Sequence, residues 1–93
     1  MKRIELNDEE IINKTYMIDL KEDGDFDVDY AEVDEEYRNV TLFGKYKECG
    51  KSKWKPAEMD IILDDDSILS EDMTITDLIK AGWESYTIDI LNK

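Results

Sequence analysis

Apolar and polar residues alternate in several short stretches of the chain, and this two-residue period is typical of β-strands with one buried face. Two such stretches, 16–21 and 25–30, flank Glu22-Asp23-Gly24 and predict a hairpin with a three-residue loop. That register is favoured because it places all the apolar side chains of both strands on one face. The predicted pairs are Leu20 with Phe26, Ile18 with Val28, Tyr16 with Tyr30 and, on the opposite face, Asp19 with Asp27.

Four further stretches show strand-like alternation, and two short helices are expected between them. The first helix begins at Asn7, which stands three residues before Glu10 as in a capping box. The second is capped by Thr74 or Thr76 and ends before Gly82. The further strands are expected at 2–6, 38–47, 57–63 and 84–91.

The 93 residues contain one proline and no internal repeat, so one domain spanning 1–93 is expected. The predicted fold is α+β, a mainly antiparallel sheet of four to five strands with one or two short helices packed on one face. Hydrophobic residues make up 41% of the chain and aromatic residues 10%, which favours a folded domain over a disordered acidic tail. No apolar run is long enough to span a membrane, and residues 1–5 lack the apolar stretch of a signal peptide. We therefore expect a cytoplasmic protein with no membrane partner.

Charge is the most distinctive property of the sequence. The net charge is −13, and residues 19–36 hold ten acidic residues and one lysine. Such a charge disfavours approach to nucleic acid, so no direct nucleic-acid binding is expected. A lysine-rich stretch, 45–55, also contains Tyr46 and Trp54, and we favour an ordinary charged hairpin over an anion-binding patch there.

Catalytic and metal-binding motifs are weak in this sequence. Histidine is absent, which removes the commonest general base and zinc ligand, and the single cysteine, Cys49, cannot form an internal disulfide. We expect neither an enzyme nor a cofactor. Residues 25, 27, 29 and 36 match four ligand positions of an EF-hand calcium loop, but Tyr30 stands where that loop needs glycine. A metal-responsive binder is therefore the third hypothesis.

The acidic run, residues 19–36, is the candidate site. Alternate carboxylates on a strand lie about 6.7 Å apart on one side of the sheet. This separation is comparable to that of successive phosphates, so the run is expected to attract the lysine- and arginine-lined groove of a protein that processes nucleic acid. Tyr37 and Trp54 join Tyr30 as candidate aromatic anchors. The predicted partner-binding residues are Asp19, Asp25, Asp27, Asp29, Tyr30, Glu32, Asp34, Glu35, Glu36 and Tyr37.

In size, charge and lack of catalytic residues, the chain resembles small acidic inhibitors encoded by phages and mobile elements, such as DNA mimics and anti-CRISPR proteins, and acidic immunity proteins. The likeness covers no defined stretch. It implies an inhibitor, monomeric or homodimeric, that blocks a basic partner's nucleic-acid-binding surface. The alternative is a housekeeping protein-interaction module or small subunit that binds through an apolar edge.

Overall fold

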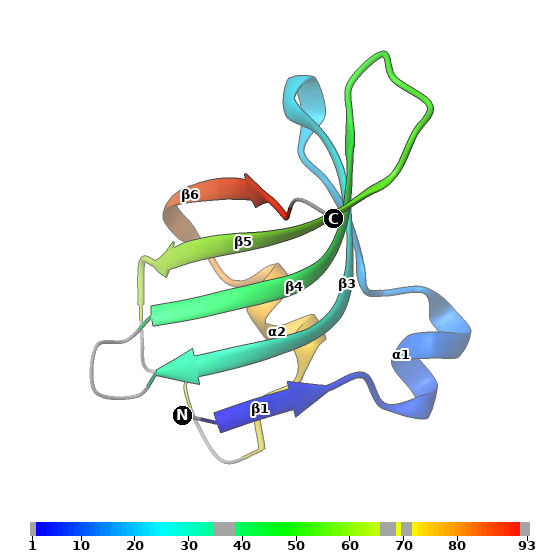
Figure 1. The fold of residues 1–93 in the computed structure, drawn as a ribbon. Helices are drawn as coiled ribbons and strands as arrows, with labels where there is room; N and C mark the ends of the chain where they lie inside the picture. The colour runs from blue at the N-terminus through cyan, green and yellow to red at the C-terminus, as the bar shows by residue number, and fades with distance from the viewer. Residues whose placement is uncertain (1, 35–38, 66–68, 70–71, 92–93) are drawn as a thin grey trace.

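The computed structural model describes residues 2–34, 39–65, 69 and 72–91, and its main feature is an antiparallel β-sheet (Figure 1). Two short α-helices, α1 (Asp8–Asn13) and α2 (Ile75–Lys80), and a 3-10 turn, η1 (Lys21–Asp23), connect the strands. The strands are β1 (Lys2–Glu5), β2 (Met17–Asp19), β3 (Gly24–Asp34), β4 (Asn39–Glu48), β5 (Lys55–Leu63) and β6 (Trp83–Ile90).

Neighbouring strands follow the order β1-β3-β4-β5-β6, and each pair is antiparallel. β2 and β1 share one edge of β3, where β2 pairs with the first part of β3 and β1 with the later part. The described part of the chain thus has six strands, more than the four to five expected. The mainly antiparallel sheet is confirmed, but it dominates the structure, so the fold is closer to all-β than to the predicted α+β class.

The β2–β3 hairpin adopts a different register from the predicted one. Ile18 lies opposite Phe26, two residues away from its expected partner, and the whole of β2 is displaced in the same way. The N–H of Leu20 donates to the carbonyl oxygen of Gly24 at 2.8 Å and closes the loop over η1. Gly24 is the first residue of β3, opposite Glu48 of β4, and is not part of the loop. Glycine is needed there because a Cβ would lie 2.2 Å from the carbonyl oxygen of Lys47 on β4.

Both helices begin at capping boxes that the local sequence encodes. The Asn7 side chain accepts the N–H of Glu10 at 2.8 Å, and the Glu10 carboxylate accepts the N–H of Asn7 at 3.0 Å, so the predicted start of α1 is confirmed. Thr74 and Asp77 form the same arrangement at α2, which selects Thr74 over Thr76 as the cap.

The hydrophobic core lies on one face of the sheet, and α2 contributes Ile75 and Leu78 to it. In Figure 1, α2 lies behind the strands and α1 lies beside β3. Ile11 and Ile12 of α1 are 51% and 76% exposed, so α1 adds no apolar side chain to the core. The largest fully buried side chains are Phe26, Leu42, Met59, Ile61, Ile75, Leu78, Val28, Val33 and Val40.

Candidate protein-binding face

A β-bulge decides which side chains of β3 point away from the core. The register with β4 shifts between Val28 and Tyr30, so Asp29 is an extra residue in the strand. An extra residue reverses the alternation of a strand. Asp27 is therefore outward before the bulge, and Tyr30 is outward after it, next to the fully buried Ala31. The prediction that Tyr30 faces the core was wrong, because it assumed uninterrupted alternation from residue 25 to residue 30.

Gly44 on β4 allows this local geometry. It lies opposite Val28, beside the bulge, and a Cβ on it would come within 1.8 Å of the carbonyl oxygen of Asp27. No side chain fits in that space, so glycine lets the backbones of β3 and β4 approach where the register changes.

We call the sheet surface turned away from the core the outer face. In its residues nine carboxylates stand against three basic side chains, and the exposed Asp29 adds another acid at the bulge. The outer face is therefore an acidic surface that extends over several strands. Its residues are Arg3, Glu5, Met17, Asp19, Asp25, Asp27, Tyr30, Glu32, Asp34, Asn39, Thr41, Phe43, Lys45, Lys47, Pro56, Glu58, Asp60, Ile62, Ser85, Thr87 and Asp89.

Lysines of β4 lie beside the first part of the acidic run. Lys47 is opposite Asp25, with its Nζ 3.8 Å from Oδ2, and Lys45 is opposite Asp27. The Nζ of Lys47 also lies 5.3 Å from the ring centroid of Trp54. These contacts support the prediction of a charged hairpin for this part of the lysine-rich stretch. The carboxylates at this end of the run are thus partly neutralised within the chain.

Asp27 occupies an unfavourable position for a charged group. Its Oδ1 is buried without a hydrogen-bond partner among the described residues. Burial, together with the neighbouring Asp25 and Asp29, raises the pKa of Asp27, and Lys45 and Lys47 only partly oppose this effect. Ionisation of the Asp27 carboxyl therefore lowers the stability of the folded chain.

An aromatic pair occupies the middle of the outer face. The rings of Tyr30 and Phe43 stack with centroids 4.7 Å apart and an angle of 9° between their planes, and neither ring belongs to the core cluster. The guanidinium carbon of Arg3 lies 3.9 Å from the centroid of Tyr30, and its Nε lies 3.1 Å from the carboxylate of Glu5. Here an arginine lies against an aromatic ring and beside a carboxylate, a favourable combination for a guanidinium group.

Further carboxylates reach the outer face from β5 and β6. Glu58 lies opposite Phe43, and Asp89 lies opposite Glu58 on the next strand. Asp60 accepts a hydrogen bond from the hydroxyl of Thr41 at 2.7 Å. The sequence places these acids on the outward side of their strands, but only the strand order shows that they surround the aromatic pair.

The remaining predicted site residues lie in three different parts of the chain. Asp19 lies opposite Asp25 and not Asp27, and its side chain accepts the N–H of Lys21 at 2.8 Å beside the hairpin loop. Glu32 and Asp34 are on the outer face with Asp25 and Asp27. The other three predicted residues, Glu35, Glu36 and Tyr37, lie outside the described residues.

Within the described ranges, no group of three potential ligands is placed to hold a metal ion. Asp25, Asp27 and Asp29 belong to a strand and not to a loop, and Glu36, the fourth residue of the EF-hand match, is not among the described residues. No helix in the described structure is long and apolar enough to cross a membrane.

Comparison of the chain with protein-family models, with curated proteins and with solved structures found no match.

Proposed function

We propose that the chain is a small acidic inhibitor whose outer face binds a basic, nucleic-acid-binding surface of a partner protein. The observation that carries this proposal is a row of side chains across five strands, in which carboxylates flank the stacked aromatic pair on both sides. The row consists of Glu5, Tyr30, Phe43, Glu58 and Asp89.

This arrangement suits a surface rich in arginine and lysine. Carboxylates form strong, often bidentate hydrogen bonds with guanidinium groups, and aromatic rings accept the flat face of the same group. Partly exposed tyrosine is also a frequent source of binding energy at interfaces. Arg3 already makes both kinds of contact inside the chain, with Tyr30 and with Glu5. A partner's arginine is expected to use the same chemistry.

The charges form a patch and not a single line along β3. Because Lys45 and Lys47 lie beside Asp27 and Asp25, the less neutralised acids are those at the bulge and on β5 and β6. Five strands about 4.8 Å apart and about eight residues long give a sheet area of about 500 Å². Without the added surface of the side chains, this area is comparable to one partner's share of a protein–protein interface at the small end of the usual range.

The test is capture of a partner by the immobilised chain, using two variants with equal loss of charge. The outer-face variant is Asp29→Asn/Glu58→Gln/Asp89→Asn, and the control is Asp8→Asn/Glu9→Gln/Asp72→Asn, whose side chains are exposed outside the sheet. We expect the wild type and the control to capture the same protein and the outer-face variant to lose it. The captured protein should elute as salt is raised, because the Debye length falls from about 10 Å at 0.1 M to about 3 Å at 1 M. It should also release labelled nucleic acid when the chain is added.

Capture that survives in the outer-face variant would refute the proposal. It would favour the alternative function, a housekeeping interaction module that binds through an apolar edge. That alternative is supported by exposed apolar side chains at the end of the edge strand β6, namely Ile90 and Leu91, which are not part of the outer face. An Ile90→Thr/Leu91→Thr variant separates the two, since only the alternative predicts that it loses the partner.

A further inference from the structure

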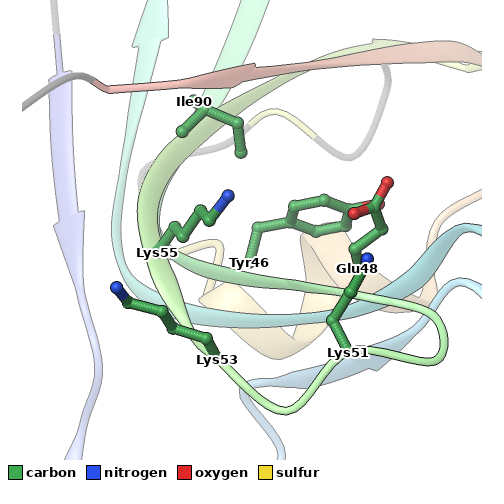
Figure 2. A pocket seen from close by; sticks show the side chains of 6 residues that line it. All are labelled: Tyr46, Glu48, Lys51, Lys53, Lys55 and Ile90. Carbon is green, nitrogen blue, oxygen red and sulfur yellow. The ribbon is translucent and has the colours of Figure 1, made fainter.

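A cavity of about 510 Å³ lies on the core side of the sheet, away from the outer face. It opens between the ends of β4, β5 and β6 and the loop that joins β4 to β5 (Figure 2). This volume is within the usual range for sites that bind small molecules. The residues that line it are Tyr46, Glu48, Lys51, Lys53, Lys55 and Ile90.

The lysines of this cavity are unusual in so acidic a chain. The chain has 25 acidic and 12 basic residues, yet within the described structure Lys51, Lys53 and Lys55 form no ion pair. Lys47 of the same hairpin lies on the outer face, beside Asp25. Among the lining residues three lysines stand against one carboxylate, Glu48, so the lining carries a net positive charge, and an anion would relieve the repulsion between its amines.

The two ends of the cavity differ in charge. Figure 2 shows Glu48 and the amine of Lys51 near the hydroxyl end of the Tyr46 ring, the amine of Lys55 near the opposite end, and Lys53 further out on the same side as Lys55. The Tyr46 hydroxyl donates to the backbone carbonyl oxygen of Asp23. Burial, followed by the charges of Glu48 and Asp23, raises the pKa of Tyr46, so the hydroxyl stays protonated and its end of the cavity lies beside negative charge. An anionic group is therefore favoured at the end formed by Lys53 and Lys55.

We propose that this cavity binds a small organic phosphate, with the phosphate at Lys53 and Lys55 and the organic part against Tyr46 and Ile90. A phosphate monoester carries a charge of about −1.5 to −2 at neutral pH, which matches two ammonium groups. Lysine binds phosphate as a compact point charge. The Tyr46 ring and the Ile90 side chain supply an apolar surface beside the amines. A polyanion is disfavoured, because the net charge of −13 repels it, whereas salt screens a small ligand from distant acids.

The experiment is an NMR titration of the ¹⁵N-labelled full chain with adenosine monophosphate as the probe, alongside adenosine and inorganic phosphate. We expect saturable shifts confined to the resonances of the cavity residues with adenosine monophosphate, weaker shifts at the lysines with inorganic phosphate, and none with adenosine. The double variant Lys53→Gln/Lys55→Gln should weaken binding of adenosine monophosphate at least tenfold. The matched control is Lys14→Gln/Lys80→Gln, which removes two exposed lysines elsewhere and should bind like the wild type.

Three results would overturn the proposal: unchanged binding by the Lys53/Lys55 variant, equal shifts at Lys14 and Lys80, or no saturable shift. The dispersion of the spectrum reports whether each variant is folded, and Lys53→Gln alone, at an exposed loop position, repeats the test with a smaller change. The outcome is independent of partner capture, since the cavity and the outer face lie on opposite sides of the sheet.

Discussion

Glu10 offers the sharpest test of how this small domain is held together. Its side chain is buried, with 4% exposure, and it joins the beginnings of both helices. One carboxylate oxygen accepts the N–H of Asn7 at 3.0 Å, which completes the capping box of α1. The other accepts the backbone N–H of Thr76 at 2.7 Å and the hydroxyl of Thr76 at 2.5 Å, in the first turn of α2. One carboxylate thus satisfies three donors.

The substitution Glu10→Gln keeps the shape but not the acceptors. An amide has one oxygen, so its NH₂ group must face a donor, either Asn7 or Thr76. Leaving a buried donor unsatisfied costs about 1–3 kcal/mol, and hydrogen bonds to a charged group are worth about 1.5–3 kcal/mol. We expect a loss of about 2–4 kcal/mol from a total of about 5–14 kcal/mol for a domain of this length. Each kcal/mol should lower the Tm by about 4–8 °C.

The assay is urea unfolding followed by circular dichroism, with Glu9→Gln as the matched control. Glu9 is exposed in the same helical turn and loses the same charge, so its effect should stay within about 0.5 kcal/mol. In a double-mutant cycle, Glu10→Gln and Thr76→Val should show strong coupling, because they remove parts of one network. Glu10 does not hold the two helix starts together if Glu10→Gln costs no more than Glu9→Gln, or if Glu10→Gln and Thr76→Val behave additively.

The close approach at Gly44 and the raised pKa of Tyr86 can each be tested by substitution. Gly44→Ala should lower the urea midpoint more than Gly50→Ala does. Alanine at position 44 would place its Cβ 1.8 Å from the carbonyl oxygen of Asp27. Alanine at position 50 would meet no atom within 4 Å and would carry only the cost of a positive φ of 83°, about 1–2 kcal/mol. A larger loss of stability for Gly50→Ala would contradict the packing at the bulge. The hydrogen bond to Asp23 and then burial raise the pKa of Tyr86 to about 12, so its stabilising contribution is complete below pH 10 and is lost as the pH rises toward 12. In a tyrosinate absorbance titration, Tyr86→Phe should remove a transition near pH 12, and an unchanged titration curve would contradict the assignment.

Local sequence determined the elements of this fold because the interactions that form them lie a few residues apart. The capping boxes at Asn7 and Thr74 each use a partner three residues away, and both helices begin where the sequence predicts. The strands likewise follow the local alternation, and Ile18 and Phe26 face the core as expected, since a shift of two residues preserves the face.

Contacts between distant segments decided the register and the site. The register of the β2–β3 hairpin differs from the predicted one, and in it Gly24 packs against the backbone of β4, where a Cβ would not fit. The bulge beside Gly44 places the Tyr30 side chain on the outer face. The pairing of β4 with β5 then brought Glu58 beside the ring that stacks on Tyr30, and Glu10 met Thr76 across 66 positions of the chain.

The acidic run was visible in the sequence as charge, but its surroundings were not. The sequence determined which residues of a strand share a face; the tertiary structure decided which strands adjoin and where a bulge reverses that face. Both decisions depend on backbone approach between segments far apart in the chain, as at Gly44. For that reason the sequence alone could predict an acidic face, whereas the aromatic pair at its centre, the acids of β5 and β6 around it and the lysine-lined cavity on the opposite side required the folded chain.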